Sequence, residues 1–198
     1  MSALNDAEQL DGLKSAAKKY GSSIITGILI ALIAFFGWEY WQKKQAAEAQ
    51  IATAKVQQLN DDAQGLAGQD NAFATLSASA DKILKDSPDA VQAIQAQMLL
   101  AKVAFDAGKY ADAERALQRV ENSKVDDAGL IHIVKLRLAY AQLAQQKYDA
   151  ALKTLTAVTD PAFKATAEEA RGDIYVAKND ISNAKKAYQS AWDDLIER

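Results

Sequence analysis

The sequence of 198 residues contains no cysteine, one histidine, two prolines and nine glycines. Without cysteine the chain can form neither a thiolate zinc site, nor a redox pair of cysteines, nor a catalytic thiol. With His132 as its single imidazole it offers no metal site built from two histidines. Proline and glycine disfavour helix interiors, so their scarcity leaves long segments free to be helical. These absences predict an all-α chain that needs no metal and no cofactor.

The sequence also lacks an excess of charge of one sign, with 23 Lys and Arg against 26 Asp and Glu and a net charge of -3. Interspersed charges provide no basic stripe for nucleic acid, and the phosphate-binding motifs GxxxxGK[ST] and GxGxxG are missing. Acidic doublets such as Asp126-Asp127 lie near predicted helix starts, where free amides favour carboxylates. We expect His132 to pack or cap, with a binding contact as the alternative. The sequence therefore predicts a protein that is not an enzyme and has no small-molecule substrate.

What the sequence does contain is one long apolar run near its start. No charged residue lies between Tyr20 and Trp38, a span of about 19 residues when roughly 20 cross the hydrocarbon of a bilayer. Apolar residues occupy every side of this helix, so no face of it can turn to water. We therefore expect a short N-terminal segment over residues 1–21 and a transmembrane helix over 22–41.

A buried core helix and a cleaved signal peptide are the two alternatives. A soluble core helix is rarely apolar all round over such a length. A signal peptide keeps its cleavage site close to the apolar region, but bulky and charged residues separate this run from the first A-x-A match at Ala47-Glu48-Ala49. Aromatic rings and lysines there fit a membrane interface instead. The predicted interface residues are Tyr20, Trp38, Tyr40, Trp41, Lys43 and Lys44.

Two small residues within the run, Gly27 and Ala31, stand four positions apart. This spacing predicts a close contact with another membrane helix, although membrane helices are in general rich in glycine and alanine. Lysines flank the run in similar numbers on both sides, so they favour neither orientation strongly.

Behind the apolar run, three segments that begin at Ala96, Val134 and Glu169 repeat one pattern. Equivalent positions in these segments are about 38 and about 33 residues apart, which brackets the 34 of tetratricopeptide (TPR) units. Small residues allow two helix axes to approach, and a Gly, Gln or Asn position suits a left-handed turn. The recurring positions are Ala101, Gly108, Tyr110, Ala113 and Leu117, then Ala139, Gln146, Tyr148, Ala151 and Leu155, then Gly172, Asn179, Ile181, Ala184 and Tyr188.

This pattern resembles the TPR family in degenerate form, because the aromatic of the family's first helix is absent. One hairpin cannot bury its own apolar face, so we predict an α-solenoid of three clear hairpins. Apolar spacing from Phe73 to Leu84 predicts the second helix of a degenerate N-terminal unit. Residues 42–66 would form a linker helix and the first half of that unit, and 67–198 the solenoid. At the far end we expect Trp192, Leu195 and Ile196 to cover the last hairpin.

A TPR solenoid has a concave face, lined by the first helix of each unit, that holds an extended peptide or a partner helix. The alternative for the apolar middle of this face is that its residues belong to the core, covered by the long N-terminal helix folding back. Carried over by register, the predicted partner-binding residues are Met98, Lys102, Phe105, Ile133, Leu136, Tyr140, Leu143, Asp173 and Val176.

The whole arrangement resembles the ancillary subunit family of the bacterial Sec translocon. The residues that carry the resemblance are Gly37, Trp38, Tyr40 and Trp41, where the chain leaves the apolar run, and the DAALKTL segment from Asp149 to Leu155. The resemblance implies a single-pass inner-membrane protein with a cytoplasmic N-terminus and a periplasmic TPR domain. It also implies association with SecYEG and with a membrane-anchored periplasmic chaperone of the prolyl-isomerase type, in handing translocated proteins to folding factors.

Two other functions remain open on the sequence alone. One is a TPR scaffold for another envelope complex, such as cell division or outer-membrane assembly. The other is a tethered adaptor that faces the cytoplasm. All of these hypotheses share a membrane-tethered scaffold without catalytic activity.

Overall fold

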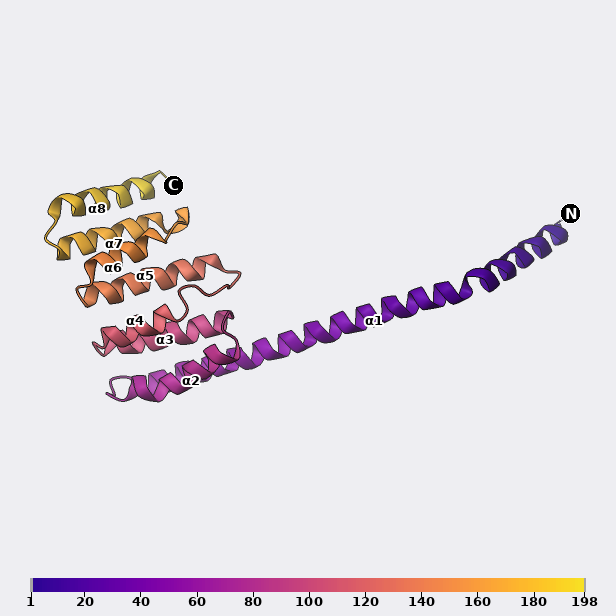
Figure 1. The fold of residues 1–198 in the computed structure, drawn as a ribbon, viewed down its shortest axis with the longest axis horizontal. Helices are drawn as coiled ribbons and strands as arrows, with labels where there is room; N and C mark the ends of the chain where they lie inside the picture. The colour runs from indigo at the N-terminus through magenta and orange to yellow at the C-terminus, as the bar shows by residue number, and fades with distance from the viewer. Residues whose placement is uncertain (1, 198) are drawn as a thin grey trace. The chain divides into compact units, whose positions relative to one another are not determined.

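The computed structural model describes the backbone of residues 2–197 and, at its N-terminal end, side chains only for Lys18, Gly21 and residues from Ile25 onward. Within these residues all regular secondary structure is helical, with no strand (Figure 1). It divides into two compact units, residues 1–51 and 52–198, with the boundary inside the first helix. The elements are α1 Ser2–Gly65, α2 Ala72–Asp86, α3 Val91–Asp106, α4 Tyr110–Gln118, α5 Ala128–Ala144, α6 Tyr148–Thr156, the 3-10 helix η1 Pro161–Phe163, α7 Lys164–Ala177 and α8 Ile181–Ile196.

The first unit contains the N-terminal part of α1, whose large apolar side chains from Ile25 onward are not buried. The large apolar side chains from Ile25 to Trp41 are 44% to 72% exposed. In the part of the chain that the structure describes, one helix, near the N-terminus, is long and apolar enough to cross a membrane by its length and composition. This exposure is the opposite of what a soluble core helix requires.

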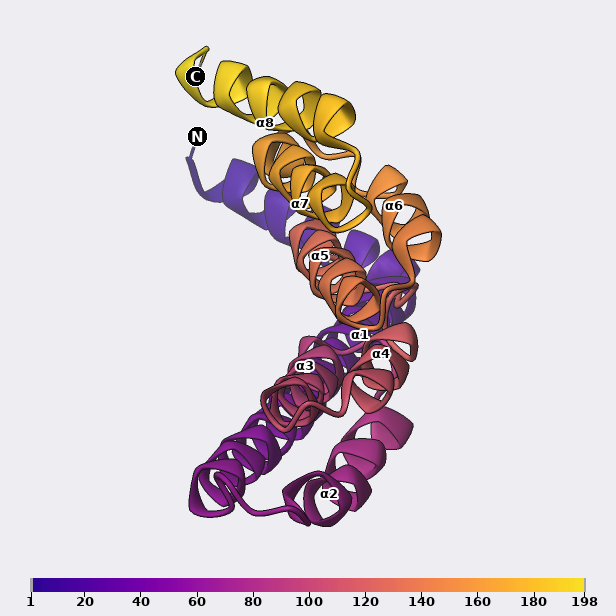
Figure 2. The same ribbon diagram turned by 90° about the vertical axis from the view of Figure 1, so that its left-hand side faces the viewer.

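The second unit is a stack of helical hairpins in chain order (Figures 1 and 2). The end of α1 pairs with α2, and the following pairs are α3 with α4, α5 with α6 and α7 with α8. In the first hairpin Leu59 and Ala63 of α1 join the core with Leu76 of α2, and Lys55 Nζ lies 2.9 Å from Asp86 Oδ2. The predicted all-α solenoid of three clear hairpins and one degenerate unit is confirmed.

Three of the hairpins turn in the same way, through a residue in the left-handed region. Gly108, Gln146 and Asn179 have φ angles of 71°, 60° and 60°. In each turn the following amide donates to the carbonyl five residues earlier, as Lys109 N does to Ala104 O at 2.8 Å. This is the Schellman arrangement, which satisfies carbonyls that the end of a helix leaves free. The predicted turn positions are therefore confirmed.

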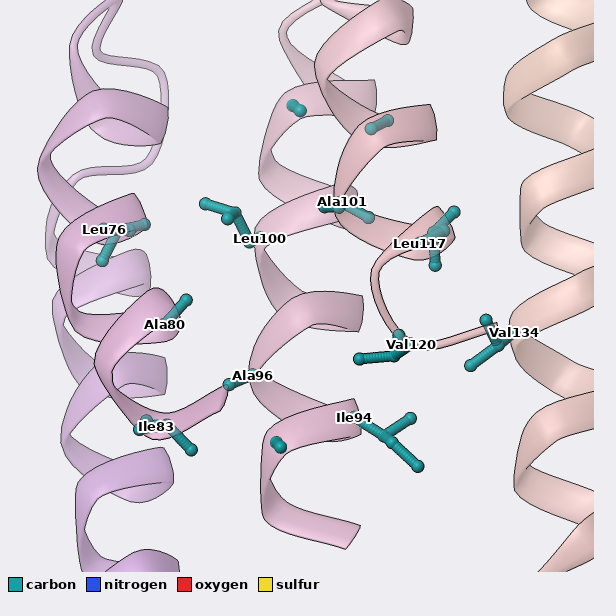
Figure 3. Close-up of a cluster of buried hydrophobic side chains, with 14 of the residues drawn as sticks. Leu76, Ala80, Ile83, Ile94, Ala96, Leu100, Ala101, Leu117, Val120 and Val134 are labelled. Carbon is teal, nitrogen blue, oxygen red and sulfur yellow. The ribbon is translucent and has the colours of Figure 1, made fainter. Parts of the chain in front are cut away.

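The core of the second unit consists mainly of small side chains. Alanine accounts for 18 of the 31 buried apolar residues in the described part of the chain. Figure 3 shows Leu76 and Ile83 pointing from α2 toward α3, while Ile94 of α3 points toward Val120 and Val134. Because alanine lets helix axes approach closely, a few leucines, isoleucines and valines are enough to fill the remaining space.

The last hairpin departs from the sequence prediction. Trp192, Leu195 and Ile196 are 61%, 60% and 65% exposed, so the expectation that they cover this hairpin is wrong. The residues of α8 that are buried are Ala184, Ala187 and Ala191. These alanines allow α8 to lie close to α7, and the helical repeat turns the larger side chains away from the contact.

One buried polar side chain gives a prediction about stability. Gln97 of α3 is 0% exposed, and neither atom of its amide has a hydrogen-bond partner in the protein. A buried polar group without a partner destabilises the folded state by about 1–3 kcal/mol. We expect Gln97→Met, which keeps an unbranched shape, to raise the free energy of unfolding by about 1–2 kcal/mol in chemical denaturation.

The matched control is Gln95→Met, at an exposed position of the same helix. The two changes are chemically identical and differ in burial. Equal effects of both would show that the gain does not come from the buried amide.

Candidate functional site

A cavity of about 340 Å³ lies between α3, α4 and α5. Four predicted partner-binding residues line it, Met98, Lys102 and Phe105 from α3 and Tyr140 from α5. Ala101 of α3 and Ala113 and Leu117 of α4 complete the apolar part of its wall. We call this cavity, with its lining residues, the groove pocket. Its size suits a large apolar side chain of a partner.

Charged residues lie at the wall of the groove pocket. Lys102 Nζ forms an ion pair with Asp106 Oδ2 at 2.5 Å, one turn along the same helix. Arg137 of α5 also lines the pocket, is exposed, and makes no ion pair within the described residues. The pocket therefore presents apolar surface beside one uncompensated positive charge.

Tyr140 connects the groove pocket to the last hairpin. Its hydroxyl donates to Asp173 Oδ2 at 3.1 Å, and the Tyr188 hydroxyl donates to Asp173 Oδ1 at 2.7 Å. Burial together with the charge of Asp173 raises the pKa of Tyr140 to about 12. The hydrogen bond to Asp173 raises the pKa of Tyr188 to about 12. Both phenols therefore stay protonated at neutral pH and hold the Asp173 carboxylate between α5 and α8.

The remaining predicted groove residues lie in different surroundings. Ile133 and Leu143 are half-buried, and Val176 is 49% exposed on α7. Leu136 is 7% exposed and packs in the core with Leu155 of α6 and Ile174 of α7. It therefore belongs to the core, but the elements that cover it are these two helices and not the N-terminal helix that the alternative interpretation named.

The register of α5 explains the position of Leu136. Positions i, i+4 and i+7 share one face of a helix, so the face that contains Ile133 and Tyr140 also contains Arg137. The register that assigned Leu136 to the concave face takes the i+3 position after Ile133, and it missed Arg137 at i+4. Helical spacing admits both positions, and the burial of Leu136 beside the exposed Arg137 separates them.

A buried charged cluster, which spacing could not predict, lies between α4 and α5. Glu114 is 7% exposed and accepts hydrogen bonds from Lys147 Nζ at 2.6 Å and from Gln145 Nε2 at 2.8 Å. Gln142, itself 5% exposed, donates to Glu114 at 3.4 Å and accepts from Thr154 Oγ1 at 2.8 Å. Every group in this cluster has a partner, which indicates that it joins two hairpins and does not bind a ligand.

The single histidine lies in a packing environment. His132 is half-buried, and its ring centroid lies 5.5 Å from that of Phe163. Within the described residues, no group of three or more His, Cys, Asp or Glu side chains could hold a metal ion.

The predicted membrane residues lie on exposed parts of α1. Trp38 and Trp41 pack ring against ring with centroids 5.5 Å apart, and Lys43 pairs with Glu39 at 2.7 Å. Tyr40 and Lys44 are exposed. Gly27 and Ala31 are exposed as well, and apart from the adjoining backbone of α1 nothing lies within 4 Å of the position of a Cβ on Gly27. The side chain of Tyr20 lies outside the described residues.

Comparison with known proteins agrees with this architecture. The tetratricopeptide repeat-like domain family matches residues 14–198. A curated relative from Aggregatibacter actinomycetemcomitans, the "Ancillary SecYEG translocon subunit", is 30% identical over 95% of this chain and 89% of its own length. The chain belongs to this family of ancillary translocon subunits. No solved structure matches it.

Other members of the family carry the same name. The relative from Neisseria gonorrhoeae is 29% identical over 97% of this chain and 90% of its own length. The relative from Escherichia coli is 25% identical over 94% of this chain and 86% of its own length. The similarity to the family thus includes both the apolar N-terminal helix and the repeat domain.

Proposed function

We propose that this protein is a membrane-tethered adaptor without catalytic activity that associates with the Sec translocon. The observation that carries this proposal is the similarity to ancillary SecYEG translocon subunits along almost the whole chain. The apolar part of α1 supports tethering, because its side chains are exposed on every side. Gly27 and Ala31 form the surface that contacts another membrane helix, since small residues let helix backbones approach.

The repeat domain acts in the periplasm, and the N-terminus lies in the cytoplasm. There the groove pocket and its neighbours Ile133, Leu143, Asp173 and Val176 bind an extended segment of a partner. The partner is a chain emerging from the translocon or a membrane-anchored chaperone of the prolyl-isomerase type that receives it. The apolar wall of the pocket supports this role, because such a surface gains free energy when a partner's side chain covers it.

Site-specific photo-crosslinking in living cells tests the proposal. A benzophenone amino acid at Phe105 or Tyr140 should capture a secreted chain or a periplasmic chaperone, and the same group at Ala31 should capture a translocon subunit. Ser79, exposed on α2, is the matched control and should capture neither. Each product is identified by mass spectrometry.

The identity of the captured protein separates the alternatives. A cytoplasmic protein bound at Phe105 would overturn the proposed orientation. Cell-division or outer-membrane assembly factors would identify a different envelope scaffold. Capture no stronger than at Ser79 would refute the groove as a binding surface.

A further inference from the structure

We propose that the exposed face of α8 is the contact surface for a second copy of this chain, which binds it antiparallel about a two-fold axis near Gln189. We call this surface the α8 face. It comprises Ile181, Lys185, Tyr188, Gln189, Trp192, Leu195 and Ile196. This contact is independent of whatever the groove pocket binds.

The apolar content of the α8 face requires a covering partner. Its five large apolar side chains are Ile181, Tyr188, Trp192, Leu195 and Ile196, which are 38% to 65% exposed. In a repeat stack each hairpin buries its apolar surface against its neighbours, so a terminal helix is normally polar on its outer side. Within the described residues α8 is the last helix of the stack and packs on α7 (Figure 2). The α8 face therefore resembles the apolar surface between two neighbouring hairpins more than the polar outer side of a terminal helix.

The charges on α8 determine which occupant fits. Lys185 and Lys186 lie in its N-terminal half and make no ion pair within the described residues, whereas Asp193 and Glu197 lie in its C-terminal half. A parallel copy would bring like charges together. An antiparallel copy instead brings the basic half of each helix against the acidic half of the other, and such self-complementarity is the property of a two-fold interface.

Residue positions give the register of this pairing. Gln189 is midway between Lys185 and Asp193, so a two-fold axis at Gln189 places Lys185 of one copy opposite Asp193 of the second copy. Within a single helix the two residues are about 12 Å apart along the axis and cannot pair. The same register sets Ile181 beside Ile196 of the second copy. A Lys185 side chain can then also lie over the ring of Trp192 of the second copy.

Cysteine crosslinking in membranes tests the contact with the full-length chain, which has no cysteine of its own. Gln189→Cys should form a disulfide-linked dimer on mild oxidation of isolated membranes, detected on a non-reducing gel. Ser79→Cys, on the exposed side of α2, is the matched control. Dimer formation no greater than in the control, or a disulfide to a different protein, would overturn the proposal.

Charge reversal in the Gln189→Cys background tests the register. Lys185→Asp or Asp193→Lys alone places like charges opposite each other twice in the dimer, and should lower the dimer yield about fivefold. Co-expression of the two single variants should restore it, because each mixed pair again matches opposite charges. Both positions are exposed, so the variants should keep the thermal melting of the parent. Unchanged yield in the single variants, or no recovery on co-expression, would refute the antiparallel pairing.

Discussion

Replacing Glu114 with alanine is expected to lower the free energy of unfolding by about 3 kcal/mol. The carboxylate is 7% exposed and holds Lys147 at 2.6 Å and Gln145 at 2.8 Å. Its loss leaves the amide of the buried Gln142 without the acceptor that lies 3.4 Å away. Because these residues belong to α4, α5 and the turn between α5 and α6, the change loosens the contact between two hairpins. Denaturant unfolding followed by circular dichroism measures the effect.

Two further variants make this result specific. Glu121→Ala removes a carboxylate just beyond α4 that has no partner in the described structure, and it should change stability by less than about 0.5 kcal/mol. Glu114→Gln keeps the shape of the side chain but not its charge. Its free energy of unfolding should lie between that of the parent and that of Glu114→Ala. If Glu114→Ala and Glu121→Ala changed the free energy of unfolding by the same amount, the cluster would not stabilise the fold.

The stabilisation that this cluster provides depends on pH, and it decreases as the pH falls. Burial acts to raise the pKa of Glu114, but hydrogen bonds from Lys147, Gln145 and Gln142 outweigh it and bring the pKa below its ordinary value of 4.5. Since the folded pKa is the lower one, the stabilisation is complete above pH 4.5 and is lost as the pH falls through the folded pKa. Below pH 4.5 the parent should therefore lose stability more steeply than Glu114→Gln.

Gly172→Ala is expected to destabilise the last hairpin by about 2 kcal/mol, although alanine is the better helix former. A Cβ at Gly172 would come within 3.0 Å of three ring atoms of Tyr188, closer than real Cβ atoms approach. The ring must then swing away from α7, and its hydroxyl loses the Asp173 carboxylate at 2.7 Å. Thermal unfolding of Gly172→Ala and of the parent measures this effect.

A double-mutant cycle isolates the steric cause. In a Tyr188→Ala background the ring is absent, so Gly172→Ala should stabilise the protein by up to about 1 kcal/mol through helix propensity. The expected result is that Gly172→Ala lowers the stability of the parent and raises the stability of the Tyr188→Ala variant. The same destabilisation in both would show that Tyr188 is not what excludes a side chain at Gly172.

Local features of this fold could be predicted from the sequence because their cause is local. The three turn residues, Gly108, Gln146 and Asn179, were recognisable from spacing because the left-handed conformation restricts which residues fit. The alanines at the helix crossings were recognisable for the same reason, as few side chains fit there. The order of the hairpins followed from these two signals.

Features that depend on distant residues could not be predicted. Spacing does not say that Glu114 meets Gln142, 28 positions away, or that Tyr140 reaches Asp173, 33 positions away. The sequence pattern predicts that Trp192 helps to cover the last hairpin, as the outer residues of a terminal repeat do. The alanines of α8 make that contact instead, and this depends on how closely the two helices approach.

The alanine-rich core has a consequence for mutational tolerance. In a core of leucine and phenylalanine most substitutions remove volume and leave a cavity, whereas every natural residue except glycine is larger than alanine. At positions such as Ala96, Ala141 and Ala151, which are 0% exposed, nearly every random change would overfill a closed space and push hairpins apart. The sequence of this scaffold is thus constrained more narrowly by an upper limit on side-chain size than by any requirement for chemistry.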